Sequence, residues 1–274
     1  MQGHSLTLEE RAWKTALWTA AVLTFVFLIA PLLAIVPLSF NGGPFLTYPM
    51  QGFSLKWYEI VFTDPAWARS LKNSLIVGVT STLLATVLGT LAAVGLQRAR
   101  FRGRGLIMAV LLSPMIVPVV IVGVGFYLFF APLGLTASYG GLILAHTALA
   151  APFVVITVNA TLQGFDTSLA RAASSLGAGP LLTFRKITLP LIAPGVASGA
   201  LFAFATSFDE VVVVLLVAGP GQRTLPREMF SGIRENISPT IMAVATLLIV
   251  FSTALLVTLE ILRRRNEKMR GVRS

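Results

Sequence analysis

The chain alternates between long apolar runs and short polar connections. Six runs are long enough to cross a lipid bilayer, which takes roughly 20 apolar residues in a helix. They extend from Ala16 to Leu38, Ser70 to Leu96, Leu106 to Phe130, Tyr139 to Leu162, Leu191 to Val217 and Pro239 to Leu262. Several contain prolines, which membrane helices tolerate because neighbouring helices satisfy the carbonyls that a proline leaves free. The pattern predicts an all-α membrane protein with about six transmembrane helices.

Composition supports this prediction. Of the 274 residues 55% are apolar and 12% are charged, which is typical of an integral membrane protein. The first run follows Arg11 and Lys14 as in a signal peptide, but its apolar stretch is too long and no small-residue cleavage site follows. We therefore expect an uncleaved first span and one multi-pass domain, residues 1–274. The chain has no cysteine, which excludes disulfides and thiolate metal sites.

The basic residues predict the orientation in the membrane. If both termini are cytoplasmic, 15 of the 21 Lys and Arg lie on the cytoplasmic side, as the positive-inside rule requires. They include the N-terminal segment 1–15, the arginines between 98 and 104, and the basic tail 263–274. The net charge of +10 is then explained by flanks beside anionic lipid, so no nucleic-acid partner is expected.

The longest internal connection on this side runs from Gln163 to Pro190. Asp166, Thr167 and Ser168 are suited to begin a helix, and Gly177 with the Gly179-Pro180 pair is suited to end it. The predicted apolar face of this helix consists of Leu169, Ala172, Ala173 and Leu176. A second short helix is expected through "LLTFRKIT", before Pro190 opens the fifth span. The first helix presents a docking surface for another protein, or alternatively lies on the membrane interface.

The spacing in this loop resembles a known signature. The loop is similar to the cytoplasmic motif of membrane subunits of ABC importers that use a periplasmic binding protein. The matching elements are Ala172-Ala173, then after three residues Gly177, after nine more Ile187, and after one more Leu189-Pro190. That motif begins with a glutamate, where this chain has Arg171. The segment from Arg69 to Gly78 resembles the opening of the family's transport core, expected over 70–262. The segments from Ser207 to Pro226 and from Ser231 to Val250 resemble the subgroup that imports spermidine and putrescine.

The resemblance implies a type I permease subunit in the bacterial inner membrane. It implies a second permease subunit, homologous but different, a pair of separate ATPase subunits, and a periplasmic binding protein docking on residues 39–69 and 218–238. The chain has no phosphate-loop motif, so we expect neither an enzyme nor a bound cofactor. The resemblance assigns the ATPase contact to Leu169, Arg171, Ala172, Ala173, Leu176, Gly177, Ile187, Leu189 and Pro190. Relatives that carry phosphonates, opines or amino-acid-like solutes share the architecture, so these substrates stay open.

Asp209 and Glu210 lie well inside the fifth run. Ionised carboxylates are costly in hydrocarbon, so they should face protein or water, and as helix neighbours they should point about 100° apart. With Ser207 they form the predicted substrate pathway, a negative site for a cationic solute. The alternative is that they pair with Arg69, Lys72 or a basic residue of a partner subunit. A self-contained secondary transporter is a weaker alternative, because few ionisable groups lie within the spans.

Other polar and small residues in the spans favour packing roles. Gly195 and Gly199 are spaced for close helix contact, either within the chain or with another subunit. His146 has no second histidine or cysteine at ligand spacing, so a hydrogen-bonded packing role is expected rather than a metal site. For Asn159 we expect a hydrogen bond between helices.

Overall fold

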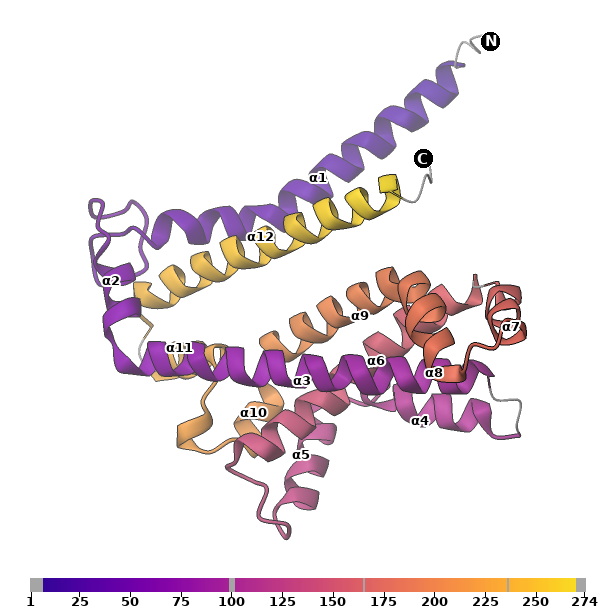
Figure 1. Cartoon of the computed structure of the whole chain (residues 1–274). Helices are drawn as coiled ribbons and strands as arrows, with labels where there is room; N and C mark the ends of the chain where they lie inside the picture. Colours follow the sequence, from indigo (N-terminus) through magenta and orange to yellow (C-terminus); the bar gives the residue numbers. More distant parts are fainter. Residues whose placement is uncertain (1–6, 99–101, 165, 236, 270–274) are drawn as a thin grey trace. The chain divides into compact units, whose positions relative to one another are not determined.

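The computed structural model describes residues 7–98, 102–164, 166–235 and 237–269. These residues form helices joined by connections, and Asn41 and Phe53 make an isolated bridge (Figure 1). Parts of the predicted loops and tails lie outside the described residues: 1–6, 99–101 with Arg100, Phe165, Asn236 and 270–274. The chain divides into a terminal unit, Met1–Asp64 with Gly232–Ser274, and a central unit, Pro65–Ser231.

The terminal unit consists mainly of three helices. They are α1 (Leu8–Leu38), α2 (Lys56–Thr63) and α12 (Pro239–Met269), and α12 contacts both of the others. Helix α1 begins before the predicted apolar run because Thr7 and Glu10 form a capping box, in which each side chain bonds the other residue's backbone N–H. The capping box thereby satisfies the N–H groups of Thr7 and Glu10, so the helix begins within the polar segment before the apolar run.

The connection before α2 is folded. Trp57 is buried and donates its Nε1–H to the carbonyl of Asn41 at 2.6 Å. The hydroxyls of Ser39 and Tyr58 lie 2.6 Å apart, and the rings of Phe40 and Phe53 stack. The connection between the first two predicted spans is therefore a folded segment that packs on α2 through Trp57 and Tyr58.

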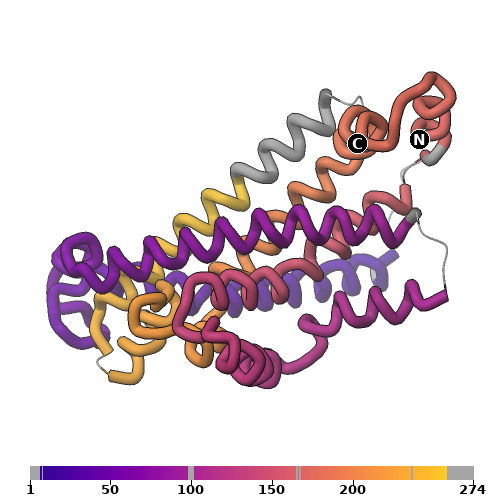
Figure 2. The backbone as a smooth tube through the Cα atoms, turned by 60° about the horizontal axis from the view of Figure 1, so that its bottom comes forward, coloured from indigo at the N-terminus to yellow at the C-terminus, as the bar shows by residue number. Residues whose placement is uncertain are grey.

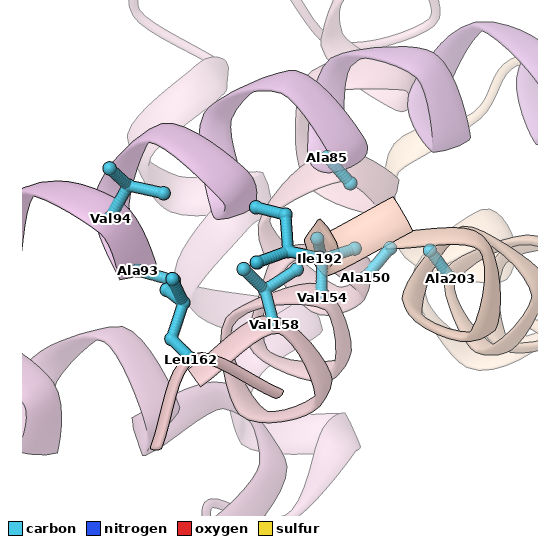
Figure 3. Packing of buried hydrophobic residues seen from close by; sticks show 9 residues of the cluster. All are labelled: Ala85, Ala93, Val94, Ala150, Val154, Val158, Leu162, Ile192 and Ala203. Carbon is cyan, nitrogen blue, oxygen red and sulfur yellow. The ribbon is translucent and has the colours of Figure 1, made fainter. Parts of the chain in front are cut away.

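The central unit is built around three long helices that contact one another. They are α3 (Pro65–Arg98), α6 (Tyr139–Gln163) and α9 (Leu189–Asp209). Figure 3 shows the apolar cluster that they share: Ala85, Ala93, Val94, Ala150, Val154, Val158, Leu162, Ile192 and Ala203. Four of the nine are alanines, whose small side chains let helices approach closely where lipid provides no hydrophobic drive for association.

Glycines mark the closest approaches. A Cβ on Gly199 would lie 2.9 Å from the Cα of Val154, and one on Gly195 would collide with the side chain of Thr161. On α3, a Cβ on Gly89 would lie 2.7 Å from the Cβ of Val154. The predicted glycine pair therefore packs against α6 of the same chain, which decides between the two partners left open by the sequence.

The third apolar run is not one continuous helix. It forms α4 (Arg104–Ile116) and α5 (Val119–Phe130), and the helix axis bends by 107° between them. Figure 2 shows the two helices running in different directions. Pro118 has no N–H and disfavours helical backbone at the residue before it, and Val117 is accordingly extended, with φ −74° and ψ 134°. In the described part of the chain five helices are long and apolar enough to span a membrane, or six with this bent pair as one.

The fifth run differs from its prediction at its start. Helix α8 (Pro180–Thr183) continues through a π-helical turn, η1 (Phe184–Thr188), directly into α9. Pro190 therefore does not open the helix. In a regular α-helix its ring would clash with the carbonyl four residues earlier, whereas the π turn widens the backbone just before it, with the Leu189 N–H bonded to the Phe184 carbonyl.

Candidate functional site

Helix α9 ends at Asp209, inside the predicted fifth span. Glu210 is extended, with φ −72° and ψ 119°, and a separate helix, α10 (Val212–Val217), follows. The prediction that Asp209 and Glu210 are successive residues of one helix is therefore wrong. The Oε1 atom of Glu210 accepts a hydrogen bond of 2.9 Å from the N–H of Val213, one of the donors that a helix leaves free at its start.

Asp209 lies on an exposed face of α9. Ser198, Phe202 and Ala205 precede it at helical spacing and are also exposed. Within the described residues its carboxylate makes no ion pair, and in particular none with Arg69 or Lys72. Because an unpaired carboxylate facing hydrocarbon is costly, this face of α9 requires a protein partner or water.

Ser207 points elsewhere. It is 4% exposed, and its hydroxyl lies 2.8 Å from the Oγ of Ser81 and 2.8 Å from the Nδ1 of His146. This polar network joins α3, α6 and α9 inside the central unit and gives His146 the hydrogen-bonded packing role expected for it. The structure thus separates Ser207 from Asp209. Asn159 has no hydrogen bond to the residues that the structure describes, so the expected interhelical bond is not formed there.

The C-terminal end of α10 is hydrogen-bonded to a residue that the sequence analysis did not identify. Arg227 belongs to α11 (Leu225–Glu235), and its Nη1 donates to the carbonyls of Ala218 at 3.0 Å and Gly219 at 3.3 Å. The carbonyl of Val214 is 3.4 Å away. Burial and the nearby Arg223 lower the pKa of Arg227 from its ordinary value. No sequence motif predicts the contact between Arg227 and the end of α10, because the contact forms only when the chain reverses direction between α10 and α11.

The turn after α10 is fastened to α3 and α6. It contains the 3₁₀ turn η2 (Pro220–Gln222). The Nδ2 of Asn73 donates to the carbonyls of Gly221 at 3.0 Å and Arg223 at 2.8 Å, and its Oδ1 accepts from the hydroxyl of Tyr139 at 2.6 Å. One buried amide of α3 therefore ties this turn to α3 and to the first turn of α6.

The loop between α6 and α9 contains the predicted helix, α7 (Thr167–Ser175). Asp166 begins it by accepting from the N–H of Ser168 at 2.8 Å, and the hydrogen bonds from Ser168 hold the pKa of Asp166 below its ordinary value. Gly177 ends it with φ +85°, and Gly177 and Ala178 donate back to the carbonyls of Ser174 and Ala173. This is a Schellman motif, so Gly177 is needed for its backbone conformation.

The residues of the predicted apolar face of α7 do not share one environment: some are exposed and one is buried. Leu169, Arg171 and Ala172 are exposed and Leu176 is 88% exposed, whereas Ala173 is buried within the central unit. At the other end of the signature Ile187 lies in η1 and Leu189 packs against the core cluster. Pro190 is exposed near the start of α9. The first part of the motif thus offers side chains outward, and the second part anchors the loop to the helix bundle.

Comparison with known families decides the class of the protein. The sequence pattern of the family described as binding-protein-dependent transport system inner membrane component matches residues 85–268. The chain belongs to this family. It is a multi-pass inner membrane protein, and the matched range includes α7, the α9–α10 break and Arg227.

Individual relatives agree with the family. The spermidine/putrescine transport system permease protein PotC of Escherichia coli K12 is 34% identical over 244 residues, 89% of this chain and 92% of PotC. The putrescine transport system permease protein PotI of the same strain is 36% identical over 253 residues, 90% of this chain and 89% of PotI. A crystal structure of a bacterial alginate ABC transporter with an alginate pentasaccharide-bound periplasmic protein contains a chain of the same fold. The TM-score is 0.69 at 17% identity, with 96% of each chain covered.

Proposed function

We propose that this chain is one of two permease subunits of an ABC importer for a small cationic solute, a polyamine such as spermidine or putrescine. The structural observation that carries the proposal is the unpaired carboxylate of Asp209 on the exposed face of α9. The names of the relatives PotC and PotI support the same solute class.

The end of α9 is suited to a cation. The last carbonyls of a helix lack partners within it and carry partial negative charge, and the Asp209 side chain adds a full charge there. In transporters, such C-terminal ends of interrupted helices coordinate cations. Phe202, which is 51% exposed on the same face, offers an aromatic surface to an ammonium group and to methylene stems. A solute with both features fits this face, whereas a phosphonate would be repelled by the carboxylate.

The proposal includes the other subunits of such an importer. A second permease subunit, homologous but different, covers the exposed face of α9, and the solute crosses between the two. A periplasmic binding protein docks on the connections 39–69 and 218–238, which requires both termini to be cytoplasmic. The family to which the chain belongs takes its name from such a binding protein. The whole chain acts as one permease domain.

A separate pair of ATPase subunits drives transport, and ATP hydrolysis is confined to them. Their contact is the outward part of α7, where Leu169, Arg171 and Leu176 are exposed. Exposed leucines beside a charge are suited to a cleft on a soluble partner. Arg171 then faces an acidic group on the ATPase, in place of the glutamate of the related motif.

The test is uptake of radiolabelled spermidine and putrescine by the complete complex in proteoliposomes. Asp209→Asn should lower uptake about tenfold or more, since a hydrogen bond to a charged group is worth roughly 1.5–3 kcal/mol. Asp209→Glu keeps the charge and is the matched control. Uptake at the wild-type rate in Asp209→Asn would contradict the proposal, and failure of that variant to assemble would make Asp209 a structural residue.

A competition experiment checks the solute class. Unlabelled putrescine should compete with labelled spermidine, whereas an alkylphosphonate or an amino acid in the same excess should not. Competition by the phosphonate alone would replace the polyamine with an anionic solute, although the chain would still be a permease subunit.

A further inference from the structure

Helix α10 has an arrangement that its sequence does not explain. It contains six residues, far fewer than the roughly 12 that an isolated helix needs even to be marginally stable. The apolar run continues from α9 through Val217, and by its pattern alone it predicts one uninterrupted helix. Something must therefore hold α10 apart from α9.

Charged side chains form hydrogen bonds at both ends of α10, and the N–H of Ala137 also donates to the carbonyl of Val217 at 2.8 Å. At its start the Oε1 of Glu210 accepts from the N–H of Val213 at 2.9 Å. At its end the Nη1 of Arg227 donates to the carbonyls of Ala218 and Gly219. Between these ends Val213, Val214 and Val217 are buried, and a Cβ on Gly123 of α5 would lie 2.7 Å from the Cδ1 of Leu216. Figure 1 shows α10 lying next to α5.

We propose that Glu210 and Arg227 are positioning residues for transport, which fix α10 so that α9 ends at Asp209, and that Glu210 does not bind the solute. This inference rests on the proposed function only in placing the transport path along α9, and not on the identity of the solute. While α10 is held, the backbone at Glu210 remains extended and α9 ends at Asp209. If α10 is released, the apolar run continues α9 as a helix, whose next N–H groups then bond to the last carbonyls of α9.

Glutamine separates the two possible roles of Glu210. Its side-chain carbonyl accepts the Val213 N–H as the carboxylate does, but it has no charge to offer a cation. Alanine removes both the acceptor and the charge. A positioning residue should therefore tolerate Glu210→Gln and fail as Glu210→Ala, whereas a cation-binding residue should fail as both.

Arg223 is a matched control for Arg227. It is more exposed, and its side chain makes an ion pair of 3.6 Å with Glu228 and none of the bonds to α10. Arg227→Met should release the end of α10, and Arg223→Met should not. Arg227→Lys retains a donor that reaches one of the carbonyls and should restore part of the effect.

The experiment combines two measurements on the complete complex in lipid nanodiscs and proteoliposomes. Hydrogen exchange of the amides in residues 211–218, followed by mass spectrometry, reports the state of α10 without any solute. Uptake of labelled spermidine and putrescine reports transport. We expect Glu210→Ala and Arg227→Met to change the exchange of this segment about tenfold or more and to lower uptake by a similar factor, with Glu210→Gln and Arg223→Met near wild type.

Two results would overturn the inference. One is wild-type exchange with uptake lost equally in Glu210→Gln and Glu210→Ala, which would make Glu210 a charge site. The other is unchanged exchange in Glu210→Ala and Arg227→Met. If Glu210→Ala does not assemble, Glu210→Gln still decides, because retained uptake supports a capping role and lost uptake excludes it. Failure of the polyamine proposal would instead appear as wild-type uptake in Asp209→Asn, with the exchange results unaffected.

Discussion

Between α4 and α5 the backbone breaks at a proline, whereas between α9 and α10 it breaks at a glutamate followed by an apolar run. At the first break Pro118 acts on its own neighbour, and Val117 is extended for a local steric reason. No proline lies between Glu210 and Val217. The second break is held by Glu210, by Arg227 of α11, and by Asn73 and Tyr139 on α3 and α6.

The two breaks differ in how far apart in the sequence the residues that cause them lie. The proline break needs only its own dipeptide, while the second break depends on residues up to 150 positions apart. A break that is held by hydrogen bonds is able to change when those bonds change, and a proline break is not. The α9–α10 junction is therefore the break that substitutions distant in the sequence can alter.

The largest effect should come from Asn73→Asp. Asn73 is buried, and its amide donates to the carbonyls of Gly221 and Arg223. Aspartate leaves both carbonyls without a donor and places a carboxylate against them, so we expect a loss of about 3 kcal/mol in the free energy of unfolding. Thermal unfolding of the purified complex measures it. Tyr139→Phe removes one hydroxyl and should cost about 1 kcal/mol. Equal effects of the two variants would show that the turn is not held by Asn73.

An intermediate effect is expected from Gly123→Leu. A side chain there collides with Leu216, so it pushes α5 and α10 apart at a typical overpacking cost of about 1–3 kcal/mol. Uptake should fall together with stability. Gly125→Leu is the control, because among the described residues nothing apart from the adjoining turns of α5 lies within 4 Å of a Cβ at that position. Similar losses in both variants would mean that α5 packs differently from the contact described.

The smallest effect should come from Pro118→Ala. Alanine permits a straight helix at the first break, but the packing of α5 on α10 opposes it, so we expect a change below about 1 kcal/mol. The chain has no cysteine, so spin labels on cysteines at exposed positions 110 and 128 measure the bend. The separation should stay well below the roughly 27 Å of a straight helix. Combining Pro118→Ala with Gly123→Leu should lengthen it, and no lengthening would show that neither feature controls the bend.

The sequence predicts the long helices well because crossing a bilayer imposes a length and a composition. The fourth run predicts a helix that ends at Leu162, and α6 ends at Gln163. The helix in the connecting loop is also well predicted, since Asp166 and Gly177 act on adjacent backbone groups. Signals of this kind are local, so they can be read without knowing the fold.

The candidate site is predicted only in part, because its geometry is made by distant contacts. Asp209 is exposed on α9, whereas Ser207, predicted beside it, is buried against His146 and Ser81. Glu210 caps α10 although the apolar run around it predicts a continuous helix. Arg227 carries no sequence signal, because the carbonyls that it binds are brought to it by the turn at Pro220–Gln222.

The π turn at Phe184–Thr188 has a consequence for the loop that contains α7. Because the helical backbone passes Pro190 without an interruption, 30 residues from Pro180 to Asp209 form one hydrogen-bonded segment. One end of this segment adjoins the loop that contains α7, and the other end carries the Asp209 carboxylate. A helix interrupted at Pro190 would leave these two ends joined by a non-helical connection, whereas the widened turn keeps them within one continuous helical segment.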